Sequence, residues 1–322
     1  MVEARVDPET GDWSVIAPRR AGRPADRPSG PAPCPFCPGN EAMTPPEVLR
    51  LPAGTDTWQV RVVPNLYALV ATDGEVRDPV PEPATSPFTG QHEVVVESDR
   101  HDWDLRSGCP DEVATVLFAM RERCRALAER KPAAISVFRN YGARAGASLS
   151  HPHTQIVALD QSPPGLVRRW RRAREHFEQA GLCLHDDVAA AERRRATRVV
   201  SDADGVLVFQ PHAAAVPHQT VLLPSDRSAD LAGASDHAVT AMARTMPRVL
   251  AGLASVLDDP AYNLVVHAGP TNVPTAHDWY RWHVSVYPRV TTPGGLEIAT
   301  GVAVNPTRPE DTAPVLRRAL AR

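Results

Sequence analysis

Two short patterns of metal-binding and nucleophilic side chains stand out in the sequence. The first is Cys34-Pro-Phe-Cys37, in which two thiols are separated by two residues and flanked by prolines. Two thiolates held on one tight turn make half of a common zinc site. A redox-active pair needs a strand before it and a helix after it, whereas the surrounding residues here are rich in Pro and Gly. The pattern therefore favours metal binding over thiol–disulfide chemistry.

The second pattern is His151-Pro-His153-Thr-Gln155. Successive side chains of a strand point to opposite faces, so these three alternate residues are predicted to face the same way. Paired histidines are open to two interpretations at this point. In the first, both are structural residues or ligands of one metal; in the second, one of them is a nucleophile.

A run of small residues from Gly142 to Ser148 precedes the histidine pair. Glycines let backbone amides approach a phosphate closely, and the hydroxyl of Ser148 adds a further donor. A histidine beside such a loop is suited to attack phosphorus. The loop therefore favours the interpretation that includes a nucleophile.

The elements that position these residues occur twice in the chain. β-branched runs predict strands and apolar residues at helical spacing predict helices. Each copy has the order strand, helix, strand, loop and strand. In the first copy the predicted strands are 92–100, 134–140 and 151–159, and the helix is 111–130. In the second copy the strands are 218–227, 262–267 and 283–288, and the helix is 235–257. We therefore predict an α+β fold of a duplicated unit, with antiparallel sheets and helices packed on one face. The predicted halves are residues 1–180, with the zinc-binding segment and the nucleophile, and residues 181–322.

Composition excludes several classes of protein. The net charge of −3 gives no reason to expect nucleic acid or an anionic membrane as partner, and we read the arginine-rich stretch 164–180 as a solvated helix. Lys131 is the only lysine and is followed by Pro132, which excludes a phosphate-binding loop of the Gly-Lys-Ser/Thr kind. No apolar run approaches the roughly 18 residues of a membrane span. The N-terminus lacks an apolar signal core, so we expect a cytoplasmic protein.

Taken together, the motifs resemble those of a known family. Asn140-x-Gly142, Gly146-x-Ser148, the His-Pro-His-x-Gln run and the Cys-x-x-Cys pair look like the hexose-1-phosphate (galactose-1-phosphate) uridylyltransferases and their close relative ADP-glucose phosphorylase. These enzymes belong to the histidine-triad superfamily, and their fold is a duplicated histidine-triad (HIT-like) unit. The resemblance spans nearly the whole chain, up to the tail 295–301.

The resemblance implies roles for particular residues. His153 would be the nucleophile, forming a covalent nucleotidyl-histidine, with Gln155 and Ser148 acting at the phosphoryl group. His151 would be a zinc ligand together with Cys34, Cys37 and one more histidine. His92 and His101 are the candidates, and the family's Ser-x-x-His pattern selects His101. The remaining implied contacts are to substrate, from Arg20, Arg23, Asn65, Asn140, Gly146, Glu297 and Gly301.

The family's chemistry moves a nucleoside monophosphate between a nucleotide sugar, a UDP- or ADP-hexose, and a hexose 1-phosphate. The leading interpretation is a UDP-glucose–hexose-1-phosphate uridylyltransferase that acts as a homodimer. Alternatives are a phosphorylase that uses inorganic phosphate, a nucleotidyltransferase of a specialised sugar pathway, a nucleotide hydrolase, and a zinc-stabilised nucleotide-binding protein without activity. The motifs do not encode the base, the sugar or the acceptor.

One departure concerns a second metal site. The family's longer members carry a His-x-His pair in the last strand, whereas this chain has His283 and Ser285 there. His267 and His283 remain, and Glu175 is a candidate third partner. We expect no second metal.

Overall fold

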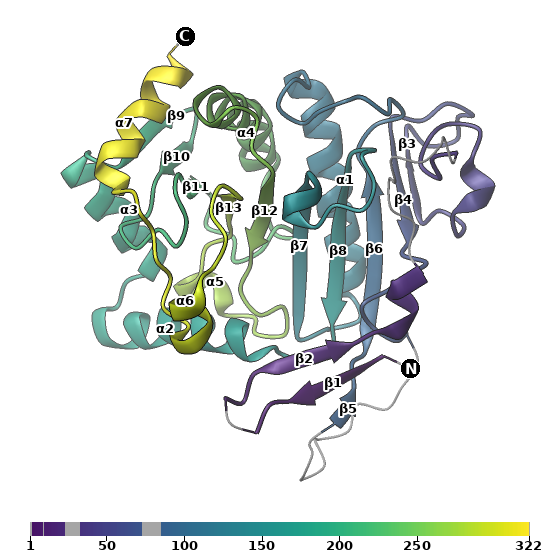
Figure 1. The fold of residues 1–322 in the computed structure, drawn as a ribbon, viewed down its shortest axis with the longest axis horizontal. Helices are drawn as coiled ribbons and strands as arrows, with labels where there is room; N and C mark the ends of the chain where they lie inside the picture. The colour runs from purple at the N-terminus through teal and green to yellow at the C-terminus, as the bar shows by residue number, and fades with distance from the viewer. Residues whose placement is uncertain (1, 9, 23–32, 73–84, 322) are drawn as a thin grey trace.

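A ten-stranded antiparallel sheet dominates the computed structural model, which describes residues 2–8, 10–22, 33–72 and 85–321 (Figure 1). Its strands follow the order β3 (Leu49–Leu51), β4 (Val60–Pro64), β6 (Gly90–Val96), β8 (His153–Leu159), β7 (Ala134–Tyr141), β12 (Tyr262–His267), β13 (His283–Pro288), β11 (Thr220–Pro224), β10 (Val206–Phe209) and β9 (Val199–Ala203). A second, three-stranded sheet has the order β2 (Trp13–Ile16), β1 (Glu3–Val6) and β5 (Thr85–Pro87).

The predicted duplication is visible in the order of the elements. Helix α1 (Pro110–Ala128) connects β6 to β7, and α4 (Asp236–Leu257) connects β11 to β12. The two copies meet in the middle of the sheet, where β7 pairs antiparallel with β12. This confirms the predicted fold class. The division at residue 180, which is the last residue of α2 (Pro164–Ala180), stays a prediction.

The main core lies between the sheet and the two long helices. α1 and α4 contact each other and cover one face of the sheet. Their apolar stripes, which include Val116 and Met242, pack on strand residues such as Ile156 and Val284. Removing one such side chain to alanine would cost about 2–5 kcal/mol. These helices therefore hold the strands, including the one that carries His153 and Gln155, in one rigid layer.

Helix α2 lies against the opposite face of the sheet. Trp170 of α2 packs with Val157 and Leu159, whose side chains alternate along β8 with those in the main core. Because α2 covers only this end of β8, the other end of the strand, which begins at His153, is left to a different set of partners. That end carries the candidate site.

A buried polar cluster braces the same strand from the helix side. Arg139 and Glu97 form an ion pair at 3.0 Å, and their side chains are 4% and 0% exposed. Thr154 donates to Glu97 at 2.6 Å, and Arg139 donates to the hydroxyl of Tyr262 at 2.7 Å. A buried charge left without its partner is costly, so these contacts fix β8 relative to β7 and β12.

The remaining helical elements are short or lie outside the central layer. They are the 3-10 turns η1 (Pro18–Gly22), η2 (Glu41–Met43) and η3 (Ala143–Ala145), and the helices α3 (Leu184–Arg195), α5 (Ala276–Trp279), α6 (Gly295–Thr300) and α7 (Pro309–Leu320). In α2, Arg171 and Arg174 are exposed and pair with acids one turn away, as expected of a solvated helix. Within the described ranges, no helix has the length and hydropathy to cross a membrane.

Candidate active site and metal cluster

Four side chains from three separate segments meet beside the start of β8. The ligand atoms of Cys34, Cys37, His101 and His151 all lie within 4.8 Å of one another. The sulfur of Cys37 is 3.3 Å from Nδ1 of His101 and 3.6 Å from Nδ1 of His151. The structure thus brings together the four residues named from the sequence as metal ligands, with His101 and not His92 as the fourth.

The donor atoms of the cluster suit a metal ion. His151 donates from Nε2 to the carbonyl oxygen of Ser98 at 2.8 Å, which leaves the lone pair of Nδ1 directed at the cluster. Burial, with a smaller effect of Cys37, raises the pKa of Cys34 to about 11, so a bound cation would favour the thiolate of Cys34. Two thiolates and two imidazoles are a typical tetrahedral set for Zn²⁺.

His153, two residues further along, is oriented by the same backbone. It donates from Nδ1 to the carbonyl oxygen of His151 at 2.8 Å. With the proton on Nδ1, Nε2 carries the lone pair and is the nitrogen able to attack. Phe36, between the two cysteines, places the centre of its ring 5.5 Å from that of His153, so the cysteine turn packs against this histidine.

Two cavities meet at His153. The first has a volume of about 340 Å³ and is mostly apolar, with walls that include Phe36 and Val63. The second, about 1030 Å³, is more polar and includes Arg106 and Arg144. His153 and Ser148 line both, so a ligand that spans the two cavities passes directly over the histidine.

Several predicted substrate contacts lie around these cavities. Arg20, Asn65, Gly146 and Gln155 line the first cavity, and Arg20 also donates to the carbonyl of Tyr67 at 2.7 Å. Asn140 lines the second cavity and accepts a hydrogen bond from Asn263 at 2.8 Å. The structure therefore gathers these five residues around His153, while Asn140 also joins the two halves.

The loop before the histidines has the predicted glycine geometry but a different donor pattern. Gly142 and Gly146 have φ of +78° and +86°, in the left-handed region, and a Cβ on Gly142 would lie 2.9 Å from that of Ala261. However, the amides of Ala145, Gly146 and Ala147 donate to carbonyls within the loop. The predicted phosphate cradle is thus wrong for these three amides, because the turn itself uses them. The side chains of Ser148 and Gln155, which line the first cavity with His153, are further candidate donors.

Two predicted contacts, Glu297 and Gly301, are not part of this assembly. Glu297 lies in α6 and accepts from the amide of Gly294 at 3.0 Å, and Gly301 ends that helix with φ +69°. Neither residue lines the first or the second cavity. Arg23 lies outside the described residues.

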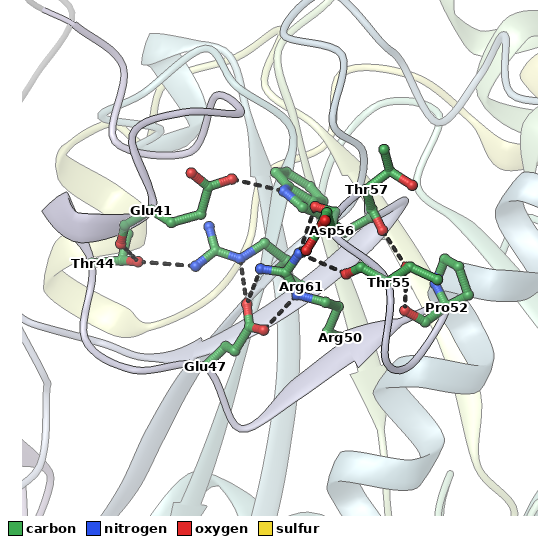
Figure 2. A network of polar contacts seen from close by, with 10 residues as sticks. Glu41, Thr44, Glu47, Arg50, Pro52, Thr55, Asp56, Thr57 and Arg61 are labelled. Atoms are coloured by element: carbon green, nitrogen blue, oxygen red, sulfur yellow. Dashed lines mark hydrogen bonds and ion pairs between the residues drawn. The ribbon is translucent and has the colours of Figure 1, made fainter.

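A polar network that the sequence did not suggest supports the wall of the first cavity (Figure 2). Arg61, which is 2% exposed, donates to Glu47 at 2.7 Å and to Thr44 at 3.3 Å. Glu41 accepts from the indole nitrogen of Trp58 at 3.0 Å. Because Thr44 lines the cavity and follows the cysteine turn by a few residues, this network ties the turn and the cavity wall to β4.

The second half repeats the backbone of the site without its ligands. His283 begins β13 as His153 begins β8, and its Nδ1 lies 3.1 Å from the carbonyl oxygen of Arg281. Where the first half has the ligand His151, the second has Arg281, whose guanidinium pairs with Asp186 at 2.7 Å. An ion pair here takes the place of a metal cluster.

We predict that protein purified without added metal holds no second metal at His267 and His283. Arg169 places a permanent cation against Nδ1 of His267, and Ser285 is a poor ligand. Glu175, the one acid considered as a partner, lies 3.7 Å from Arg171. Metal analysis should therefore give one zinc per chain, and a second stoichiometric metal would contradict the prediction.

Comparison with known proteins decides the family. The model of the galactose-1-phosphate uridyl transferase N-terminal domain matches residues 1–163. ADP-glucose phosphorylase of Arabidopsis thaliana is 33% identical over 328 residues, covering 98% of this chain and 92% of that protein. The chain belongs to the galactose-1-phosphate uridyl transferase family. It is therefore an enzyme of the nucleotidyltransferase class.

Other members of the galactose-1-phosphate uridyl transferase family match at full length. The galactose-1-phosphate uridylyltransferase of Thermotoga maritima is 25% identical, with 98% of each chain covered. Among solved structures, the ADP-glucose phosphorylase of Arabidopsis thaliana with bound ADP-glucose has a TM-score of 0.80 at 32% identity, with 98% of both chains covered. A uridylyltransferase structure has a TM-score of 0.83 at 27% identity, covering 99% of this chain and 98% of that one.

Proposed function

We propose that the protein moves a nucleoside monophosphate from a nucleotide sugar to a hexose 1-phosphate through a covalent nucleotidyl-His153. The observation that carries the proposal is the hydrogen bond from Nδ1 of His153 to the carbonyl oxygen of His151, on a histidine that lines both cavities. With its hydrogen on Nδ1, the ring keeps the lone pair on Nε2 for attack. Binding alone needs no such nucleophile.

The proposed reaction has two displacements. Nε2 of His153 attacks the α-phosphorus, the bond from phosphorus to the sugar-phosphate oxygen breaks, and the sugar 1-phosphate leaves with that electron pair. The histidine becomes cationic, and the hydrogen bond from Nδ1 to the carbonyl of His151 stabilises that charge. The phosphate oxygen of the acceptor then attacks the same phosphorus and expels neutral His153.

The cavities suggest how the substrate is divided. The apolar walls of the first cavity suit a nucleoside, with Arg20, Asn65 and Gln155 beside its phosphate end. The arginines of the second cavity, Arg106 and Arg144, suit the phosphorylated hexose. Transfer between the two therefore takes place over His153.

Zinc completes the proposal as a structural ion held by Cys34, Cys37, His101 and His151. When bound, it supplies the charge that keeps both cysteines as thiolates and crosslinks the cysteine turn to the start of β8. The cysteine turn also carries Phe36, which lies against His153. The metal therefore stabilises the position of the nucleophile and does not enter the reaction.

Two pairs of donor and acceptor are candidates. The leading candidate is UDP-glucose with hexose 1-phosphate as acceptor, as in the uridylyltransferases. The second is phosphorolysis of ADP-glucose, favoured by the 33% identity to ADP-glucose phosphorylase over 98% of the chain. Incubation with UDP-glucose or ADP-glucose alone, followed by intact mass spectrometry, distinguishes them through the added UMP or AMP. Absence of any added nucleotide would contradict the covalent mechanism.

We further place Glu297 and Gly301 at the interface of a homodimer. Helix α6 buries none of its residues, and Ile298 and Leu296 are 80% and 58% exposed. Exposed apolar side chains gathered on one short segment suit a docking surface. A second copy that receives α6 could bring Glu297 to the cavities of its partner.

Ile298→Glu is expected to shift the protein towards monomers and to lower activity, because it introduces a charge into the proposed interface. Leu182→Glu is the matched control, since Leu182 is 56% exposed but lies at the end of α2. Sedimentation velocity measures the assembly. A wild-type monomer at assay concentration, or an Ile298→Glu protein that stays dimeric, would argue against this interface.

A further inference from the structure

His92 is a buried histidine that neither the metal cluster nor the proposed displacement uses. It lies on β6, beside the strand that carries His153 and Gln155, and is 4% exposed. The backbone amide of Leu69 donates to its Nδ1 at 3.0 Å. Because an amide can only donate, Nδ1 is the unprotonated nitrogen and Nε2 carries the hydrogen. Burial lowers the pKa of His92 to about 4, which keeps this neutral form.

Among the contacts of the described residues, the hydrogen on Nε2 of His92 has one acceptor. Two side-chain atoms lie 3.1 Å from this nitrogen, Oε1 of Gln155 and Nδ2 of Asn65. The oxygen of Asn65 already accepts from the amide of Tyr67 at 2.8 Å, so its nitrogen is the end turned towards His92 and can only donate. The hydrogen bond therefore runs from His92 to Oε1 of Gln155.

These hydrogen bonds set the orientation of the side-chain amide of Gln155, which accepts at its oxygen and donates at its nitrogen. With Oε1 occupied by His92, the NH₂ group is what Gln155 can offer to a ligand in the cavity that it lines with His153. If the amide flipped, it would present its oxygen to an anion and repel it. A donor aimed in advance at developing negative charge stabilises a transition state most.

We propose that His92 is a positioning residue that holds the amide of Gln155 with its NH₂ group towards the phosphoryl oxygens of the nucleotide. The inference rests on the proposed function. As the bond from His153 to phosphorus forms and the bond to the sugar-phosphate oxygen breaks, negative charge on the non-bridging oxygens meets this donor. His92 acts through Gln155 and does not touch the substrate.

The test compares three replacements of His92 in the full-length protein. His92→Phe removes both hydrogen bonds and keeps a planar ring. His92→Asn keeps an acceptor near Leu69 but is too short to reach Gln155. His92→Gln reaches far enough to donate to Gln155. The readout is the single-turnover rate of nucleotidylation with whichever nucleotide sugar labels the wild type, alongside KM, zinc content and melting temperature.

We expect His92→Phe and His92→Asn to slow nucleotidylation about 10- to 100-fold, less than the 10²–10³-fold typical of deleting a donor outright. KM should change little, zinc content should remain at the wild-type level, and His92→Gln should restore most of the rate. His92→Phe combined with Gln155→Ala should be no slower than Gln155→Ala alone.

The outcomes separate the inference from the function on which it rests. If the wild type gains no nucleotide, the proposed function is wrong. If the wild type is labelled but all three variants react at its rate, or the Phe and Ala replacements slow it additively, His92 does not act through Gln155. Should His92→Phe fail to fold, the contrast between His92→Asn and His92→Gln decides, and equal rates for those two would overturn the proposal.

Discussion

Replacing His153 by glycine is expected to abolish nucleotidyl transfer while leaving the fold and the zinc in place. The side chain supplies the lone pair for the first displacement, and no other residue lining both cavities offers an imidazole in the same orientation. Loss of a covalent nucleophile lowers turnover by many orders of magnitude, with about 10⁶-fold measured for such residues in other enzymes. Turnover and intact mass after incubation with the nucleotide sugar measure the effect.

The second half of the chain provides the control for this variant. His283 begins β13 in the same way, with its Nδ1 near the carbonyl of the residue two positions before it. His283→Gln should retain nucleotidylation, because His283 lines neither of the two cavities at His153. Near-normal activity of His153→Gly protein, or kinetics without a labelled intermediate, would rule out the double displacement.

The second large effect concerns the metal. Cys34→Ser should eliminate tightly bound zinc, because it leaves three ligands of a closed site and removes one of its two thiolates. The cysteine turn would then lose its crosslink to the start of β8, and Phe36 its position against His153. Misplacement of a reacting group by about 1 Å can cost about 10²-fold in rate. The zinc content, the melting temperature and the turnover rate should all fall together.

Cys109→Ser is the matched control for this prediction. Cys109 is exposed, precedes α1 and takes no part in the metal cluster. Its replacement should leave zinc content and turnover unchanged. One full zinc equivalent in Cys34→Ser protein would show that the four ligands have been assigned incorrectly.

Local sequence patterns predicted most of the secondary structure around the site. The apolar spacing of 111–130 and 235–257 corresponds to α1 and α4, because an amphipathic period of 3.6 residues has few other solutions in a packed protein. The β-branched runs correspond to β6, β7, β8 and β12, because β-branched side chains pack well on the pleated surface of a sheet. The alternation in His151-Pro-His153-Thr-Gln155 likewise predicted a strand, and β8 begins at His153.

The site itself depends on contacts between residues far apart in the chain, and periodicity carries no information on those. Cys37 and His101 are 64 positions apart. The resemblance could name His101 rather than His92, but only the folded chain shows its contact with the cysteines. The loop at Gly142 likewise has its predicted glycine geometry, but closure of the turn uses three of the amides expected to bind phosphate.

By itself, the sequence determined which residue types could carry the chemistry, because spacing within one strand or one turn is a local property. The tertiary structure decided how they are used. The pairing of β7 with β12 joined the copies into one sheet, and the register between β6 and β8 placed His92 beside Gln155. The direction of the Gln155 amide follows from a hydrogen-bond chain through Leu69, His92 and Gln155. Such a chain exists only once separate strands have been packed side by side, because each donor needs an acceptor from another segment.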